Sequence, residues 1–232
     1  MNTTRVRQGL ANSSSSVRLQ AALAAGTTPD PHLIDTLVEQ CAVEPDFYVR
    51  DMLTWALTRH PPAATVPRLI SELGSSRAQA RSQALHSLSK IGERSAWPSV
   101  TPELLTDPDD EVARAAWRTA AGLVPDGSEP ELAGILVTQL GRGERETQLS
   151  LSRALITLGE VILPLLATAS AHPDPVVVRH ATATEQLFHD PDAGFDFAVD
   201  QAKRIVALGP DGPPAQPSSA LPTVAEQPGV LP

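Results

Sequence analysis

The chain contains a single cysteine, Cys41, and few aromatic residues, which make up only 3% of its 232 residues. One thiol excludes an intrachain disulfide and a zinc site built from several cysteines. Because Cys41 lies in the apolar run 33–43, we expect it to be buried and inert. β-Sheets are usually rich in aromatic and β-branched side chains. Their scarcity beside abundant alanine and leucine therefore favours an all-α fold.

Long hydrophobic runs and an excess of basic residues are also missing. No stretch approaches the roughly 18 uninterrupted apolar residues of a membrane span, and residues 1–16 lack the apolar core of a secretory signal. We therefore expect a cytoplasmic protein with no membrane partner. The formal net charge is -9. Nucleic acid is thus a disfavoured partner, because neutralising phosphates needs a concentrated basic field, although a local basic face stays compatible with this composition.

Recognisable catalytic signatures are absent from the sequence. It has no Gly-rich phosphate loop, no Gly-x-Ser-x-Gly elbow and no His-Glu-x-x-His motif. The acidic run 107–111 lacks the spaced ligands and central glycine of a calcium loop, and we interpret it as a helix start. His180 is expected to be a solvated helix residue. The expectation is a non-catalytic protein with no metal and no cofactor.

What the sequence does contain is an internal repeat. A Val-Arg pair, or a variant of it, opens each of several Ala/Leu-rich runs, and we call the position of its arginine the Arg slot. The slot is occupied in turn by Arg18, Arg50, Arg81, Ala113, Gln148 and Arg179. Successive slots are 32, 31, 32, 35 and 31 residues apart. Such a period indicates a solenoid, in which each unit must stack on its neighbours to bury its apolar face.

A second series of residues supports the same period. Prolines stand early in helix-like segments that alternate with the Arg-slot segments: Pro31, Pro67, Pro102, Pro130 and Pro164. Proline is tolerated in the first turn of a helix because that amide has no acceptor within the helix. Each unit is therefore predicted to be helix, turn, helix. Glycines are predicted to end the Arg-slot helices: Gly26, Gly92, Gly122 and Gly159.

These patterns predict three parts of the chain. Residues 1–200 form an α-solenoid of about six helix-turn-helix units. Residues 201–209 form the end of a last helix. Residues 210–232 are rich in Pro, Gly, Ser and Gln, and we expect a disordered tail there because this composition offers no face to bury.

The alternation of a Pro-containing helix with an Asp-Pro-Asp-x-x-Val-Arg turn resembles HEAT repeats. The best copies are 44–50, 107–112 and 174–181, and the resemblance covers roughly residues 12–200. The units are short, and are more similar to compact bacterial and phycobilin-lyase-like HEAT repeats than to eukaryotic ones. The resemblance implies a right-handed superhelix, with the Arg-slot helices on the concave surface and the Pro-containing helices on the convex surface.

The resemblance also implies a structural ladder between neighbouring units, in which turn aspartates pair with slot arginines. The residues to which it assigns this role are Arg18, Arg50, Arg81, Arg179, Asp46 and Asp174. Ala113 and Gln148 occupy the slot in two units, so the ladder is predicted to be weak there.

A row of side chains recurs five positions after each slot: Leu23, Trp55, His86, Arg118, Arg153 and Thr184. A constant offset returns to the same side of every stacked helix, so these residues should be neighbours on the concave face. Trp and Arg are the most frequent anchors of protein interfaces. With nearby residues added, the predicted partner-binding stripe is Trp55, Arg59, His86, Lys90, Arg114, Trp117, Arg118 and Arg153.

The leading functional hypothesis is a scaffold whose concave groove binds another protein, through a helix or an extended acidic segment. Three alternatives remain open. Trp55 and Trp117 could simply pack between helices beside ordinary solvated cations. A HEAT-like alkylpurine DNA glycosylase uses Trp and Arg with an Asp on its concave face, for which Trp55, Trp117, Arg153 and Asp51 are the candidates. A phycobilin-lyase-like chaperone subunit is supported by the short unit length alone.

Overall fold

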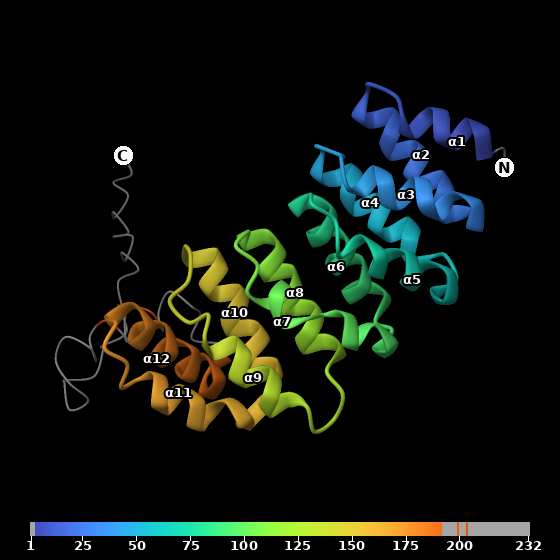
Figure 1. The fold of residues 1–232 in the computed structure, drawn as a ribbon. Coiled ribbons are helices and arrows are strands. Elements are labelled where there is room, and N and C mark those ends of the chain that lie inside the picture. The colour runs from blue at the N-terminus through green and yellow to red at the C-terminus, as the bar shows by residue number, and fades with distance from the viewer. Residues whose placement is uncertain (1–2, 192–198, 200–202, 204–232) are drawn as a thin grey trace, which may run out of the picture.

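The computed structural model describes residues 3–191 together with residues 199 and 203. Twelve α-helices and three short 3-10 helices follow one another along this part of the chain, and no strand occurs in it. The helices stack into an arc with the N-terminus at one end, as Figure 1 shows. The all-α solenoid is thus confirmed. The predicted helix end at 201–209, apart from Lys203, and the predicted tail at 210–232 lie outside the described residues.

The arc has two layers and six helix pairs. The inner layer contains the helices that follow each Arg-slot turn: α2 (Ser15–Thr27), α4 (Phe47–Thr58), α6 (Ala78–Ile91), α8 (Asp110–Leu123), α10 (Arg145–Thr157) and α12 (Pro175–His189). The outer layer consists of α1 (Thr3–Leu10), α3 (Ile34–Cys41), α5 (Pro62–Glu72), α7 (Pro102–Leu105), α9 (Glu129–Val137) and α11 (Leu163–Ala169). The 3-10 helices η1 (Pro31–Leu33), η2 (Arg94–Ser99) and η3 (Gly159–Ile162) precede α3, α7 and α11. Figure 1 shows α4, α6, α8 and α10 on the inner side of the arc.

One main core runs through the described units between the two layers, and Ala183 and Leu187 of α12 form a second, small cluster. In α4 the residues that repeat with helical periodicity, among them Val49, Leu53 and Leu57, are fully buried. Cys41 belongs to this core, and burial raises the pKa of its thiol to about 12. The thiol is therefore protonated and unreactive at neutral pH, as predicted.

The predicted helix ends are correct in two units and wrong in two others. Gly92 is the left-handed C-cap of α6, with φ 73°, and Gly159 adopts φ 78° just after the end of α10. Gly26 and Gly122 instead lie inside α2 and α8. At Gly26 the reason is space, because a Cβ there would lie 2.3 Å from Cζ3 of Trp55. The missing side chain thus allows α2 and α4 to approach closely.

The helix starts follow the expected chemistry. Pro31, Pro102, Pro130 and Pro164 stand in first turns, whereas Pro67 lies inside α5, which begins at Pro62. The turn aspartates are N-caps: Asp46, Asp109 and Asp174 accept hydrogen bonds from the first amides of α4, α8 and α12. The acidic run before α8 therefore acts as a helix start, as predicted.

Slot arginines hold the turn of their own unit. Arg18, Arg50 and Arg81 each donate to the backbone carbonyl six residues earlier, which belongs to Asn12, Glu44 and Ser75 respectively. In two units the guanidinium also reaches the next unit. Arg18 pairs bidentately with the buried Glu44 at 2.7 Å, and Arg81 pairs with Asp107 at 2.9 Å. These pairs form a ladder between units. Its carboxylates, Glu44 and Asp107, each stand two residues before the aspartate that caps the next inner helix.

The predicted roles of Asp46, Asp174 and Arg50 in the ladder are therefore wrong. Asp46 and Asp174 use their carboxylates to cap α4 and α12. Arg50 bonds only to carbonyls, those of Glu44 and Pro45, among the contacts of the described chain. The unit that would follow Arg179 lies outside the described residues, so its ladder role stays a prediction.

Two units lack a slot arginine. In one of them the Gln148 side chain donates, among the described residues, only to the carbonyl of Gly143 in its own turn. The other, with Ala113, is held by an arginine of the following unit. Ala113 leaves the carbonyl of Asp107 without its usual partner, and Arg142, from the loop before α10, donates to that carbonyl. The same guanidinium pairs with Asp110 at 2.8 Å and stands 5.8 Å from the ring centroid of Trp117. The ladder is therefore not weak at Ala113, because Arg142 replaces the missing side chain.

His180 joins the last two units and is buried, so its prediction as a solvated residue is wrong. Its Nδ1 accepts the Gly141 amide hydrogen at 2.9 Å, which leaves the proton on Nε2 to donate to the Gln148 carbonyl at 3.0 Å. Burial lowers the pKa of His180 to about 4. The ring is therefore neutral at pH 7 and links the irregular 141–148 segment to α12.

Candidate functional site

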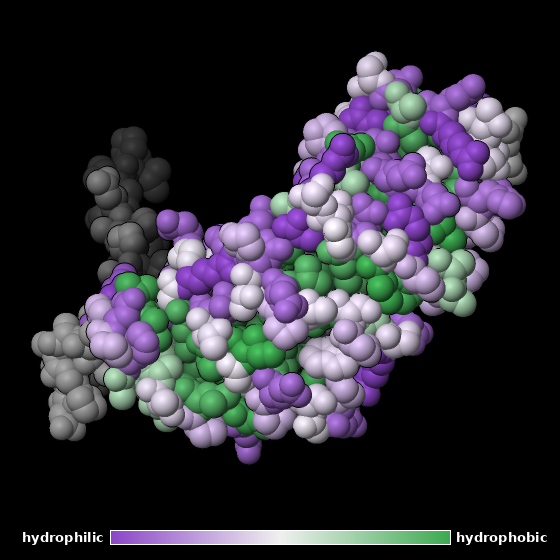
Figure 2. Space-filling view, in the orientation of Figure 1, coloured by the Kyte–Doolittle hydropathy of each residue, from purple (hydrophilic) through white to green (hydrophobic). Residues whose placement is uncertain are grey.

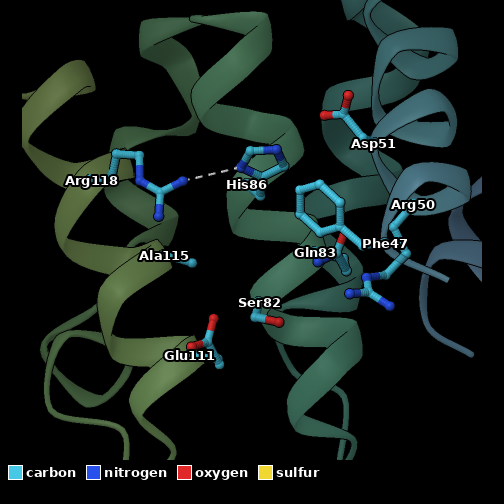
Figure 3. A pocket seen from close by; sticks show the side chains of 9 residues that line it. All are labelled: Phe47, Arg50, Asp51, Ser82, Gln83, His86, Glu111, Ala115 and Arg118. Carbon is cyan, nitrogen blue, oxygen red and sulfur yellow. Dashed lines mark hydrogen bonds between the residues drawn. The ribbon is translucent and has the colours of Figure 1, made fainter. Parts of the chain in front are cut away.

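Two adjacent hollows open on the inner layer of the solenoid. The first, which we call the aromatic pocket, has a volume of about 300 Å³ and lies between α4, α6 and α8 (Figure 3). It is lined by Phe47, Arg50, Asp51, Ser82, Gln83, His86, Glu111, Ala115 and Arg118. The second, the arginine pocket, has a volume of about 440 Å³ and lies between α6, α8 and α10. Its lining is Ser89, Arg114, Arg118, Ala121, Gly122, Glu146, Ser150, Arg153, Ala154 and Thr157.

Small residues between longer ones create these hollows. Ala115, Ala121 and Gly122 face the pockets from α8, where a larger side chain would fill the space. Arg118 lines both pockets, so they meet at this side chain. In Figure 2 the inner edge of the arc is covered mainly by hydrophilic side chains, and green apolar patches lie along its body.

In the aromatic pocket an exposed ring faces a neutral histidine. Phe47 stands at the start of α4 and is 65% exposed, and Figure 3 shows its ring pointing into the pocket. Arg118 donates from Nη1 to Nδ1 of His86 at 3.3 Å. Burial lowers the pKa of His86, and the nearby cations Arg118 and Lys90 lower it further. His86 is thus neutral at pH 7 and acts as an acceptor for Arg118.

The arginine pocket concentrates positive charge. Three guanidinium groups line it, and its one carboxylate, Glu146, is held by Arg145 outside the pocket at 2.9 Å. Arg114 pairs with Glu111, but its buried Nε has no hydrogen-bond partner within the described part of the chain. Burial and the neighbouring Arg114 lower the pKa of Arg118, whose guanidinium still remains charged at neutral pH.

Arg118 and Arg153 line the arginine pocket without a carboxylate partner among the described residues. Neither forms a salt bridge with any described residue, whereas Arg18, Arg81 and Arg142 each pair with one. An arginine that folding leaves unpaired beside a hollow is available to an anionic ligand.

Trp117 does not belong to the predicted stripe. It is fully buried, and its Nε1 donates to the carbonyl of Leu105 at 2.7 Å. Position 117 follows the slot by four residues rather than five, and that step turns the side chain from the pocket into the core. Trp117 therefore cannot contact a partner or take part in a DNA-glycosylase-like arrangement with Trp55, Arg153 and Asp51.

The other members of the predicted stripe are not buried. Trp55 is 37% exposed and packs one part of its ring on Gly26, so it is partly a packing residue, as the alternative interpretation held. Arg59 and Lys90 are exposed near the C-terminal ends of α4 and α6 and line neither pocket. His86, Arg114, Arg118 and Arg153 line the pockets.

Sequence reasoning missed Phe47 and Tyr48, which are 65% and 73% exposed and meet edge to face at 5.6 Å. In the sequence both residues stand inside the turn motif 44–50. Comparison of the units three positions before the slot would have revealed Phe47. The other units have Ser15, Ala78, Asp110, Arg145 and Val176 there.

The fold and the hollowed inner layer define an α-helical repeat protein. Within the described residues, no cluster of His, Cys, Asp and Glu has the arrangement of a metal site. No described helix combines the length and apolar character that crossing a membrane requires.

Residues 34–122 match the family model for HEAT repeats. Among solved structures, the complex of CpcE and CpcF of phycocyanin lyase from Nostoc sp. PCC7120 is similar, with a TM-score of 0.49 and 18% identity. That match covers 88% of this chain and 87% of the other. No curated protein matches the sequence.

Proposed function

We propose that this HEAT-repeat protein is a non-catalytic, cytoplasmic scaffold whose inner face binds another protein. The observation that carries the proposal is the pair Arg118 and Arg153, which line a pocket without a carboxylate partner among the described residues. The net charge of -9 shows that acidic groups are in excess over the chain as a whole. In a chain with an excess of acidic groups, two cations that lack a carboxylate and line the same hollow favour an acidic partner.

The aromatic side chains next to these cations favour a protein over a nucleic acid. Phe47 offers exposed apolar area at the edge of the same groove, and Trp55 lies on the same helix. Aromatic and arginine side chains together are typical anchors of protein interfaces. A nucleic acid would require a continuous row of cations along its backbone, and Asp51 and Glu111 interrupt any such row.

Site-specific photocrosslinking tests where a partner binds. A benzophenone amino acid is placed at Gln83 in the aromatic pocket, at Ser150 in the arginine pocket, and at Glu131 on the outer helix α9 as the matched control. The proposal predicts that one protein is crosslinked from positions 83 and 150 and not from position 131. Crosslinking from position 131 alone would place the partner on the outer layer and refute the proposal.

A further inference from the structure

We infer that the two pockets are unlike subsites for one extended segment, which places an aromatic or apolar side chain in the first and a carboxylate in the second. This inference rests on the proposed function and goes beyond it by defining the chemistry and spacing of the bound segment.

The aromatic pocket is electrically balanced. Arg50 and Arg118 line it together with Asp51 and Glu111. Of these carboxylates Glu111 is paired with Arg114, and His86 is neutral. A carboxylate that entered this pocket would approach two other carboxylates. An uncharged side chain avoids that repulsion and gains contact with the exposed ring of Phe47. The aromatic pocket therefore favours an apolar or aromatic group.

The arginine pocket has the opposite preference. Arg114, Arg118 and Arg153 line it, and Arg114 is paired with Glu111. The one carboxylate of the lining, Glu146, is paired with Arg145, so Arg118 and Arg153 are the cations without a carboxylate. Guanidinium groups bind carboxylates through paired, charge-assisted hydrogen bonds. The Nε of Arg114 is buried and out of reach of a partner, so the available donors are those of Arg118 and Arg153, which have no carboxylate among the described residues. A carboxylate of the partner would supply acceptors for these donors.

The spacing of the subsites follows from the shared residue. Because both pockets include Arg118, they are neighbours one inner helix apart. Packed helices lie about 8–10 Å apart. In a polyproline II segment, residues i and i+3 point to the same side and are about 9 Å apart, since the rise is about 3.1 Å per residue. The bound segment should thus carry its apolar side chain and its carboxylate three residues apart.

A bound helix fits these hollows less well. It is about 10–12 Å wide and would cover the ridge formed by Arg118 instead of inserting one side chain on each side of it. A narrow, extended backbone can cross this ridge and enter both hollows. The geometry therefore favours an extended acidic segment over a helix.

Fluorescence anisotropy with labelled synthetic peptides tests the inference on the full-length protein. Each proline-rich peptide carries one Phe and one Glu at i and i+3, with matched peptides in which Glu is placed at i+1 or replaced by Gln or Lys. We expect the i, i+3 Phe/Glu peptide to bind at least about tenfold more tightly than the other three, because a tenfold difference corresponds to one well-formed polar anchor. Arg153→Ala should remove this preference and leave the affinity for the Phe/Gln peptide unchanged.

Two controls separate charge from folding. Arg94→Ala removes an exposed outer-layer arginine and should leave all affinities unchanged. Circular dichroism should show the same helical content in both variants.

Equal affinity for the Glu and Lys peptides, equal affinity for the i+1 and i+3 spacings, or an equal loss of Phe/Gln binding in Arg153→Ala would overturn the inference. Tighter binding of a single-stranded oligonucleotide than of any peptide would also overturn it. If crosslinks from positions 83 and 150 persist in any of these cases, the inner face is still the docking site, and only the two-subsite recognition is wrong.

Discussion

Gly26 and Trp55 show how one side chain sets the distance between two units. Trp55 lies against the backbone of α2 where Gly26 has no side chain, and a Cβ at position 26 would also be 2.9 Å from Cα of Ala56. Because the second neighbour is backbone, a rotamer change of Trp55 alone cannot relieve the clash. The outer part of the tryptophan ring remains available at the surface.

We therefore expect Gly26→Ala to destabilise the protein by about 1–3 kcal/mol, as overpacked core substitutions do. Alanine has the higher helix propensity, by about 1 kcal/mol, so propensity alone predicts the opposite sign. Gly134→Ala in α9 is the matched control, because a Cβ there meets nothing within 4 Å. Urea unfolding should show stabilisation of about 0.5–1 kcal/mol for the control. Stabilisation by both substitutions would show that α2 and α4 are not in this close contact.

The limits of sequence reasoning are clearest at neighbouring positions. Trp117 and Arg118 are adjacent in the sequence, and both were predicted to face the partner. Successive residues of a helix point about 100° apart, so one step separates the core from the pocket, and Trp117 is buried. The repeat predicts that the position five residues after each slot faces the inner surface. It does not predict how many neighbouring positions of the helix are also accessible. Packing against the outer helices decides that number.

Among the elements, the seams between units depend on residues that lie far apart in the sequence. The helix pairs and most helix starts were predictable, because periodicity and capping are local. The partners of the slot arginines were not. Glu44 and Asp107 each lie 26 residues beyond the arginine they bind, and each takes part in a turn that also contains a capping aspartate. Each of these turns has two acidic residues that could, from the sequence alone, pair with the arginine. Only the folded geometry shows which one binds it and which one caps the helix.

Arg142 provides a test of the seam at α8. Arg142→Ala should lower the free energy of unfolding by about 1.5–3 kcal/mol, the range for hydrogen bonds with charged groups, because it removes the partners of Asp110 and of the Asp107 carbonyl. Arg94→Ala, at an exposed arginine of the outer layer, is the matched variant and should change it by less than about 0.5 kcal/mol, as is typical of surface changes. Urea unfolding of both variants measures this. An equal effect of the two would mean that Arg142 does not hold the seam.

The seam between α10 and α12 should be sensitive to acid because of His180. Its pKa is about 4 in the folded protein and about 6.5 in the unfolded chain. The unfolded chain therefore binds the additional proton, and stability falls as the pH drops from about 6.5 towards 4. At pH 5 the loss from this group is about 2 kcal/mol relative to pH 7.

Unfolding experiments on wild type and on His180→Gln between pH 7 and pH 5 measure this contribution. The variant lacks a titrating group at position 180, so its stability should decline less over this range by about 2 kcal/mol. His86, whose pKa is also lowered, is present in both proteins and cancels in the comparison. Parallel pH profiles would contradict the buried, neutral state of His180.

For the whole molecule, the period predicted the architecture and the number of units because a solenoid is stabilised by contacts between neighbours. The pockets could not be predicted in the same way. They depend on which small residues of one inner helix face longer residues of the next, as Ala121 and Gly122 face Arg153 across the arginine pocket. Contacts between units also decide which arginines have no carboxylate partner in the folded protein.

The most direct test of the central claim is calorimetric titration of the crosslinked partner, once purified, against wild type and the Arg118→Ala/Arg153→Ala double variant. If the inner face is the docking surface, the double variant should bind with a dissociation constant at least about tenfold higher, a loss of about 1.4 kcal/mol or more. Arg94→Ala on the outer layer should bind like wild type. Unchanged affinity of a correctly folded double variant would contradict the account and remove the two arginines from the binding site.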